Sequence, residues 1–337
     1  MKLHLGSPRA IGMVVALLAM LTATLLPYAR SGTELVRLRN ALLFETGEPA
    51  SFEWTPAKLP ADFPVDGQVP ELPFGPVVAA LPQAGDDWSR ALEMARHLVR
   101  HAKFGNPAKS DLHGTYRTIL AGGGYCADYS RVMVAMAGSA GLFAREWAFS
   151  FDGYGGHGHA FVEVFDRASG QWRMIDAFNN FYPVDTASGQ PLSALQWRER
   201  LRAGQTDGVR IMPIGPGRPG FRTDAQLFDY YRRGADQWYL WWGNAAYTYD
   251  ASPATRLLGG VSRALEQLAA IGLGVHPRIQ AIPSETNAQM REAMVRLKGQ
   301  LVATGVAGGA LSILLCFQLF SLWRRRRADW PHGVRHA

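Results

Sequence analysis

The sequence contains one cysteine in a setting that would activate it as a nucleophile. Cys126 follows the run Gly122-Gly123-Gly124-Tyr125, and the apolar pattern over 125–137 predicts a helix that begins beside it. The partial positive charge at a helix N-terminus lowers the pKa of a thiol and favours the reactive thiolate. The glycines leave the approach open and let backbone N–H groups point at a bound carbonyl oxygen. A phosphate-binding loop is excluded, because no Lys-Ser/Thr pair follows the glycines.

A histidine and an aspartate lie on two strands of a predicted hairpin. The stretches 144–151, 159–166 and 171–177 have strand patterns, and the turn 167–170 joins the last two. If Asp166 opposes Gln171, the numbers of opposed residues add up to 337 along the whole pair of strands. His159, which begins the second strand, and Asp176, which ends the third, then lie diagonally on one face, about 7 Å apart at the backbone.

Cys126, His159 and Asp176 together supply a nucleophile, a base and an acid that orients the base, in that order along the chain. A carboxylate at one ring nitrogen would hold the imidazole, and the other nitrogen would take a proton from the thiol. A zinc set of these three residues with His157 is a competing interpretation. The glycines at 153, 155, 156 and 158 favour instead a mobile loop over a substrate cleft.

Four blocks of this segment resemble the transglutaminase-like superfamily. They are Gly-Tyr-Cys-Ala-Asp-Tyr-Ser at 124–130, Gly-Leu-Phe-Ala-Arg-Glu-Trp at 141–147, His-Ala-Phe-Val-Glu-Val at 159–164 and Trp-Arg-Met-Ile-Asp at 172–176. The resemblance covers about 110–180 and implies an α+β fold with a papain-like core, in which a cysteine-bearing helix packs on an antiparallel sheet. It also implies Cys126 as the nucleophile, His159 as the base and Asp176 as the third member, and no metal or other cofactor is expected.

One position departs from the pattern of that family. The family often has Trp two residues after the histidine, and Phe161 stands there in this chain. The change is conservative and leaves the triad in place. The resemblance does not identify the side chain that would stabilise the oxyanion, for which Tyr116 and Tyr125 are the candidates.

Several charged or titratable side chains near these motifs have two interpretations each. Asp128 would either shape the pocket beside the thiol or interact with the helix dipole. Glu163 would either support the site or pair with Arg173. His97 and His101 have the i,i+4 spacing of a zinc-binding helix, but no Glu follows the first His, which favours a solvated helix face.

Two uncharged apolar runs near the ends of the chain predict membrane helices. Residues 10–29 and 299–323 each approach the ~20 residues that a spanning helix needs. The cluster Arg324–Arg327 predicts that the C-terminal end stays in the cytoplasm. With both ends of the chain in the cytoplasm, the middle segment lies on the other side of the membrane. The first run could also be a cleaved signal with Ala29-Arg30-Ser31 as its site, although its length favours a retained anchor.

The basic charge of the chain belongs to these ends. The formal net charge is +7, with +3 in residues 1–30 and +4 in residues 299–337, which leaves 31–298 neutral. This distribution argues against nucleic-acid binding, since the large middle segment offers no net positive charge to phosphates. A hydrophobic content of 47% and only 2 cysteines exclude a disordered chain and a disulfide scaffold.

The chain divides into six segments. They are the N-terminal end with the first membrane segment (1–30), an extended Pro-rich lead (31–83), the catalytic domain (84–205), an aromatic and helical extension (206–298), a membrane helix (299–323) and a basic cytoplasmic tail (324–337). Helices are expected over 34–46, from Asp86 or Asp87 to about Lys103, and over 193–203, 254–272 and 285–298. The run Trp238–Trp242 is a sugar-stacking platform, a bilayer anchor or core packing, the last being favoured.

These observations predict a cysteine enzyme anchored in the inner membrane, with its catalytic domain in the oxidising periplasm. Cys126 would attack an amide or ester carbonyl and form a thioester, which then passes to water or to an amine. We favour hydrolysis of a peptide-like or protein-like envelope substrate. The alternative is a non-catalytic scaffold ectodomain in envelope or polysaccharide assembly.

Overall fold

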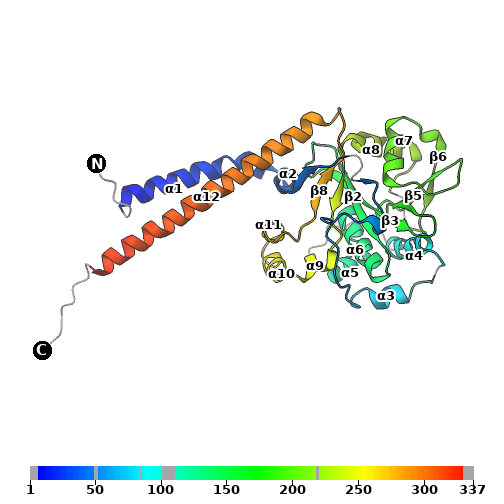
Figure 1. The fold of residues 1–337 in the computed structure, drawn as a ribbon, viewed down its shortest axis with the longest axis horizontal. Helices are drawn as coiled ribbons and strands as arrows, with labels where there is room; N and C mark the ends of the chain where they lie inside the picture. The colour runs from blue at the N-terminus through cyan, green and yellow to red at the C-terminus, as the bar shows by residue number, and fades with distance from the viewer. Residues whose placement is uncertain (1–6, 49–51, 84, 101–110, 218–219, 329–337) are drawn as a thin grey trace.

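The computed structural model describes residues 7–48, 52–83, 85–100, 111–217 and 220–328 (Figure 1). The α-helices are α1 (Pro8–Ala23), α2 (Gly32–Leu43), α3 (Gly75–Ala79), α4 (Asp87–Val99), α5 (Leu112–Leu120), α6 (Cys126–Ser139), α7 (Ala194–Arg202), α8 (Asp224–Gly234), α9 (Ala246–Ala251), α10 (Pro253–Gly259), α11 (Arg263–Gly272) and α12 (Ala288–Ala328). Short 3-10 turns cover Leu26–Arg30, Pro56–Lys58, Thr206–Gly208 and Ala235–Gln237.

A mixed six-stranded sheet forms the centre of the domain. Its strands are β1 (Phe44–Thr46), β2 (Ala144–Ser150), β3 (Gly158–Asp166), β4 (Gln171–Ile175), β7 (Trp238–Trp242) and β8 (Arg278–Ala281). Their order is β1-β8-β7-β2-β3-β4, with every neighbour antiparallel except the parallel pair β1–β8. A separate antiparallel pair joins β5 (Phe181–Asp185) and β6 (Val209–Pro213). The predicted α+β class is confirmed, and the sheet draws strands from the lead, the central segment and the C-terminal extension.

The predicted hairpin forms with the predicted register. Val162 opposes Ile175 and Asp166 opposes Gln171, so opposed residue numbers add up to 337. The ladder ends at Ile175, and Asp176 pairs instead with Phe181, where the chain turns towards β5. Apolar side chains alternate along β3 because one face packs on helices while the other packs on aromatic side chains.

Helix α6 covers one face of the sheet. It packs on β2 and β3, and α4 and α5 flank it. Val132, Met133 and Met136 of α6 are fully buried in an apolar cluster with Val162 and Ile175 of the sheet. A second cluster on this side, here called the Tyr154 cluster, fills the space towards β7, β8 and α12; it contains Ala41, Leu43, Phe44, Ala148, Tyr154, Ala160, Tyr239, Trp241, Ile279, Ala281, Met294 and Leu297.

The run of aromatic residues at 238–242 is packing within the protein. It forms β7, in which every residue is buried between β2 and β8. Trp238 and Trp242 join an apolar cluster on the second face of the sheet, together with Phe52 and Trp54 of the Pro-rich lead. Core packing is therefore the correct interpretation, and the sugar platform and the bilayer anchor are wrong.

A buried ion pair lies in the aromatic cluster on this second face. Arg145 Nη2 and Glu163 Oε2 are 2.8 Å apart, and the side chains are only 1% and 0% exposed. Glu163 also accepts hydrogen bonds from Trp147 Nε1 at 2.7 Å and from the backbone N–H of Ala194 at 2.7 Å. The Arg145 guanidinium lies 3.8 Å from the centre of the Trp172 ring, which gives it a cation–π contact. Glu163 therefore pairs with Arg145, whereas Arg173, its other possible partner, pairs with Asp166.

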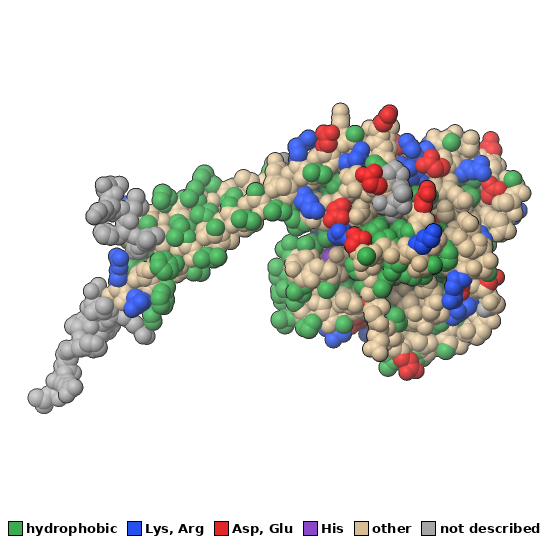
Figure 2. Space-filling model, viewed as in Figure 1, with side chains coloured by type: hydrophobic (Ala, Val, Ile, Leu, Met, Phe, Trp, Pro, Cys, Tyr) green, Lys and Arg blue, Asp and Glu red, His purple; other side chains and the backbone are tan. Residues whose placement is uncertain are grey.

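The two predicted membrane segments differ in the structure. Within the described residues, the helix covering Ala288–Arg325 is long and apolar enough to cross a bilayer, and hardly any of its most apolar stretch is buried by protein. Helix α1 has 16 residues and packs along α12 (Figures 1 and 2). The predicted run 10–29 is wrong in its last six residues: α1 ends at Ala23, and a 3-10 turn that contains Pro27 covers Leu26–Arg30.

Most other predicted helices are present with shifted ends. Asp86 caps α4 and Ser193 caps α7, as expected. The last residues of the predicted helix after Asp87, including His101, lie outside the described residues. The single helix expected over 254–272 is wrong: Gly259 and Gly260 end α10, and the Ser262 side chain caps α11.

Replacing Glu163 with Gln should destabilise the domain strongly, because the buried Arg145 charge would lose the one carboxylate that pairs with it among the described residues. We expect the free energy of unfolding to fall by about 3–5 kcal/mol. The matched control is Glu199→Gln, since Glu199 pairs with Arg198 but is 64% exposed, and its loss should cost less than about 1 kcal/mol. Urea unfolding of the full chain in detergent measures both. Equal losses in the two variants would contradict the structural role of the Arg145–Glu163 pair.

Candidate active site

Cys126 is the first residue of α6 and is half-buried. The chain reaches it through Gly124, whose φ of 92° lies in the left-handed region that favours glycine. A Cβ at this position would also lie 3.1 Å from the side chain of Ile119. Asp128, in the first turn, accepts a hydrogen bond from the backbone N–H of Tyr125 at 2.9 Å. Asp128 therefore caps the helix that holds the thiol, which agrees with the interpretation of a residue placed for the helix end.

His159 lies on β3 with its imidazole between the thiol and a carboxylate. Its Nε2 donates to Asp176 Oδ2 at 2.7 Å, and Cys126 forms a hydrogen bond with the same ring. Burial lowers the pKa of His159, but the charges of Asp176 and Cys126 and their hydrogen bonds outweigh burial and raise the pKa to about 10. The site therefore favours an imidazolium, with its Nε2 hydrogen-bonded to Asp176.

Asp176 is fully buried and is held by donors from three residues. Besides His159, Asn179 Nδ2 donates at 2.8 Å and the Tyr231 hydroxyl donates to the same oxygen, Oδ2. The backbone N–H of Asn179 donates to Oδ1 at 3.0 Å. Burial alone would raise the pKa of Asp176, but the His159 charge and these hydrogen bonds hold it below its usual range. The carboxylate thus stays ionised and fixed in orientation.

Aromatic rings enclose the imidazole of His159. Phe161 lies at 6.3 Å between ring centres with nearly parallel planes, and Phe149 lies at 5.7 Å. Tyr230 and Tyr231 of α8 contact the ring edge-to-face, each at 5.8 Å. This wall keeps water away from the His159–Asp176 hydrogen bond, and the phenylalanine at the position where the family often has Trp still provides a stacking surface.

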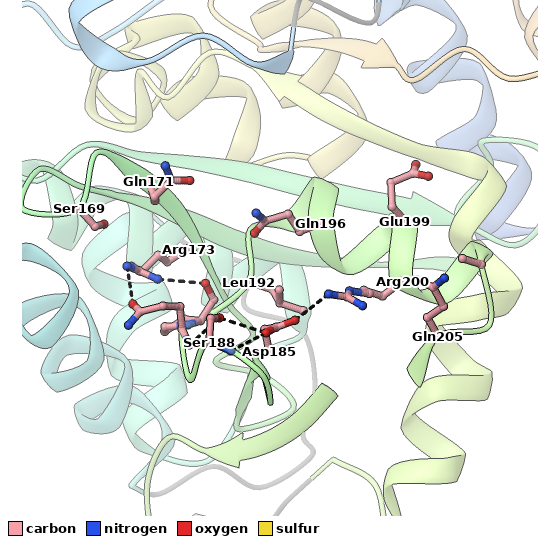
Figure 3. Close-up of a pocket in the computed structure, with 13 residues that line it drawn as sticks. Ser169, Gln171, Arg173, Asp185, Ser188, Leu192, Gln196, Glu199, Arg200 and Gln205 are labelled. Atoms are coloured by element: carbon pink, nitrogen blue, oxygen red, sulfur yellow. Dashed lines mark hydrogen bonds and ion pairs between the residues drawn. The ribbon is translucent and has the colours of Figure 1, made fainter. Parts of the chain in front are cut away.

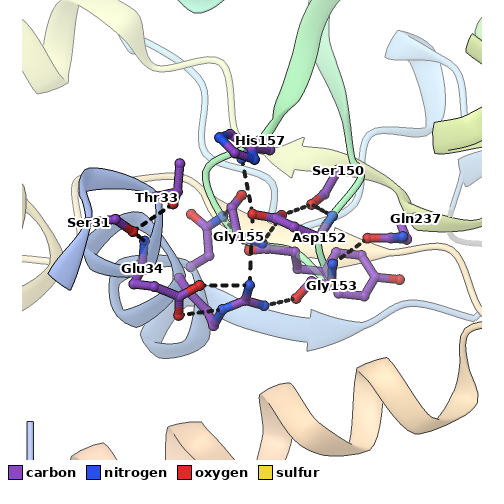
Figure 4. A network of polar contacts seen from close by, with 12 residues as sticks. Ser31, Thr33, Glu34, Ser150, Asp152, Gly153, Gly155, His157 and Gln237 are labelled. Carbon is purple, nitrogen blue, oxygen red and sulfur yellow. Dashed lines mark hydrogen bonds and ion pairs between the residues drawn. The ribbon is translucent and has the colours of Figure 1, made fainter. Parts of the chain in front are cut away.

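The glycine-rich loop before His159 is held by hydrogen bonds from α2. Figure 4 shows Asp152 at the centre of a network that joins the loop to α2. Asp152 accepts from Ser150 Oγ at 2.6 Å and from the backbone N–H of Gly155 at 2.9 Å. From α2, Arg37 donates to the Gly153 carbonyl at 2.9 Å and Asn40 donates to the Tyr154 carbonyl at 2.8 Å. These bonds tie the loop to α2 at the approach to β3, and the expected mobility of the loop stays a prediction.

Tyr231, Asn179 and Tyr230 contact the site but were not predicted. Tyr231 stands 55 residues beyond Asp176 in the chain, and no local pattern connects α8 with the hairpin. Asn179 lies three residues after Asp176 in the turn to β5, so a search for turn residues beside the triad would have found it.

The two tyrosines considered as donors to the oxyanion lie in different environments. Tyr116 is buried and forms a hydrogen bond with His97 Nε2 at 2.7 Å. The prediction that His97 lies on a solvated helix face is therefore wrong. Tyr125 is 49% exposed, immediately before Cys126. His157 is exposed, and no group of three or more His, Cys, Asp or Glu side chains suited to a metal ion occurs among the described residues.

Three depressions of the domain differ in whether their lining contacts the triad. The largest of the three has a volume of about 700 Å³ and is lined by residues between Ser169 and Gln205. Two of its lining side chains, Arg200 and Asp185, form an ion pair with each other at 2.7 Å (Figure 3). A cavity of about 140 Å³ flanks the first turn of α6 and contains Glu146, whose pKa burial raises to about 8. No triad residue lines either one. A groove of about 610 Å³ on α8 is also lined by no triad residue, but its Tyr230 contacts the His159 ring.

Replacing Tyr231 with Phe removes one donor from Asp176 and keeps the ring. We expect the free energy of unfolding to fall by about 1.5–3 kcal/mol at neutral pH, the usual worth of a hydrogen bond to a charged group. The lowered pKa of Asp176 contributes stability above its unfolded value of 3.8, and this contribution is lost as the pH falls through the folded pKa. The difference from the parent should therefore persist to about pH 4 and shrink below it.

Urea unfolding of the full chain in detergent at several pH values measures this difference. The matched control is Tyr230→Phe, because Tyr230 adjoins Tyr231 on α8 and packs on the same imidazole. A loss that is equal in both variants, or that does not change with pH, would show that the Tyr231 hydroxyl does not stabilise the Asp176 charge.

Comparisons with known proteins give one match among solved structures and one family match. A solved structure that matches part of the chain is "The Crystal Structure of a Putative Cysteine Protease from Cytophaga hutchinsonii", with 15% sequence identity and a TM-score of 0.28. The match covers 50% of this chain and 55% of the other, so it spans about half of that protein. Comparison with curated proteins gives no match.

A family match covers the site itself. The model of the transglutaminase-like superfamily matches residues 78–177. This range includes α6 with Cys126, the hairpin with His159, and Asp176 at the end of the match. Residues 78–177 of this chain therefore form a domain of the transglutaminase-like superfamily.

Proposed function

We propose that this protein is a membrane-anchored cysteine enzyme that cleaves amide bonds of a peptide-like envelope substrate through a thioester. The observation that carries the proposal is the imidazole of His159, which is hydrogen-bonded to a buried carboxylate and also interacts with the Cys126 thiol. A thiolate–imidazolium pair of this kind is a nucleophile with a proton donor beside it.

In the first half of the reaction, the Cys126 thiolate attacks the carbonyl carbon and a C–S bond forms. The carbonyl π electrons move to oxygen, where the N-terminus of α6 offers backbone N–H groups and positive partial charge. As the tetrahedral intermediate collapses, the C–N bond breaks and the His159 imidazolium gives its proton to the leaving nitrogen. The products are a free amine and a thioester on Cys126.

In the second half, His159 acts as a base. Acylation removes the negative charge of Cys126, which is one of the groups that raise the pKa of His159. The neutral imidazole then takes a proton from water, the oxygen attacks the thioester, and the C–S bond breaks. Asp176 keeps its charge throughout and holds the ring. Substrate flanking the reacting bond would lie in the groove on α8, beside Tyr230.

We place the catalytic domain on the periplasmic side of the inner membrane. Helix α12 supports anchoring, because it is long and apolar and its apolar stretch lies outside the protein core. The cluster Arg324–Arg327 after this stretch supports a cytoplasmic C-terminal end. The neutral formal charge of residues 31–298 is consistent with a domain that crossed the membrane.

The thiolate–imidazolium pair predicts how Cys126 labelling depends on pH. In the full chain with Cys316→Ser, we expect iodoacetamide labelling at pH 6 to stay within about threefold of its rate at pH 8. In His159→Ala the rate should fall about tenfold per pH unit below the ~8.5 of an ordinary thiol. The control is His157→Ala, two residues away and exposed. If both substitutions leave the profile unchanged, the catalytic pairing is absent and the scaffold alternative takes its place.

Hydrolysis and cross-linking differ in their products. The full chain is incubated with envelope-type peptides in ¹⁸O-labelled water with a primary amine added, and products are analysed by mass spectrometry. We expect ¹⁸O in a newly formed carboxylate, and a loss of at least about 10³-fold in Cys126→Ala but none in Cys316→Ala. Amine adducts in place of labelled acid would identify a cross-linking enzyme, and a reaction that persists in Cys126→Ala would exclude this nucleophile.

A further inference from the structure

Helices α10 and α11 form a hairpin that exposes apolar side chains. Leu257 and Val261 are 75% and 74% exposed, and Leu273, Leu268 and Leu265 are 57%, 54% and 41% exposed. Exposed leucines on soluble proteins usually occur singly, and a contiguous group marks a surface that contacts something. These five side chains are here called the hairpin rim.

The hairpin is apolar on two sides, and the protein covers only one of them. On α11, Ala270 is fully buried and Ile271 packs against the Tyr154 cluster. Leu265 and Leu268, three residues apart, lie together on another face and remain exposed. The rim is therefore not the solvated side of an ordinary amphipathic helix.

The position of the hairpin indicates what contacts the rim. Tyr28, which follows α1, and Leu301, at the start of the uncharged run of α12, pack against the same Tyr154 cluster as Ile271. Helix α11 also contacts α2. The hairpin thus lies at the level where α12 leaves the domain and its apolar side chains become exposed.

The pictures agree with this placement. Figure 1 shows α10 and α11 on the side of the domain from which α1 and α12 extend. Figure 2 shows hydrophobic side chains gathered on that side, below the two long helices. Between 252 and 275 the charged residues are Arg256, Arg263 and Glu266, a net charge of +1 that suits lipid phosphates.

We propose that the α10–α11 hairpin is an interfacial membrane element whose rim enters the headgroup–acyl boundary of the bilayer that α12 crosses. This inference rests on the proposed membrane anchoring. A shallow apolar contact of this kind adds membrane affinity to that of α1 and α12, and it sets the tilt of the domain on the membrane surface.

Lipid-borne quenchers test the contact. The full chain is placed in nanodiscs of phosphatidylcholine and phosphatidylglycerol that carry nitroxide lipids, with a bimane fluorophore on single cysteines in a Cys126→Ser, Cys316→Ser background. Test positions are Leu257→Cys and Val261→Cys. The control is Leu72→Cys, since Leu72 is 68% exposed and precedes α3, which lies at the lower edge of the domain, farther from α1 and α12 than the hairpin does (Figure 1). A further variant retains Cys316, within the apolar stretch of α12.

We expect nitroxide lipids to reduce fluorescence about twofold or more at 257, 261 and 316, and to leave residue 72 unchanged. Quenching at 316 with no difference between 257, 261 and 72 would overturn the hairpin contact and leave the anchoring intact. That outcome includes a rim covered by a protein partner. No quenching at 316 would overturn the anchoring, and the hairpin contact would fall with it.

Discussion

The arrangement of this domain depends on keeping one buried charge, that of Asp176, fully compensated. An unpaired carboxylate in an aromatic interior would be neutralised by a proton instead of staying ionised. Compensation needs His159 from β3, Asn179 from the turn to β5, and Tyr231 from α8. Residues as far apart in the chain as His159 and Tyr231, which are separated by 72 positions, must therefore be in place together. Because the same contacts orient the imidazole, the compensation of the charge and the geometry of the site are one constraint.

The parts of the site that sequence reasoning reached are those with local patterns. The glycine run before Cys126 indicates a helix start, and strand alternation with a short turn sets the register that brings His159 to Asp176. Tyr231 has no such pattern, since its role depends on how α8 packs over the sheet. The single helix expected over 254–272 also failed, because the periodicity of apolar residues continues through Gly260 although the backbone turns there.

Helix α2 connects two regions that the linear sequence separates. It follows the apolar helix α1 and packs on α12, and its Arg37 and Asn40 hold the loop before β3. His159 is the second residue of that strand. The position of His159 is thus tied to α2, through hydrogen bonds from Arg37 and Asn40 to the backbone carbonyls of Gly153 and Tyr154. Glycines in the loop permit the turn, and hydrogen bonds from α2 hold the loop.

Strand β1 runs parallel to β8 at the edge of the sheet, with Phe44 opposite Ile279. Helix α2, which precedes β1, contacts α12, which follows β8, so the two ends of the chain leave the domain side by side. In the proposed topology each leads to its own segment in the bilayer. One proteolytic cut in a surface loop between them would leave both fragments tethered and still paired along this edge. Shedding of the domain from the cell surface would require two cuts, one beyond each of these strands.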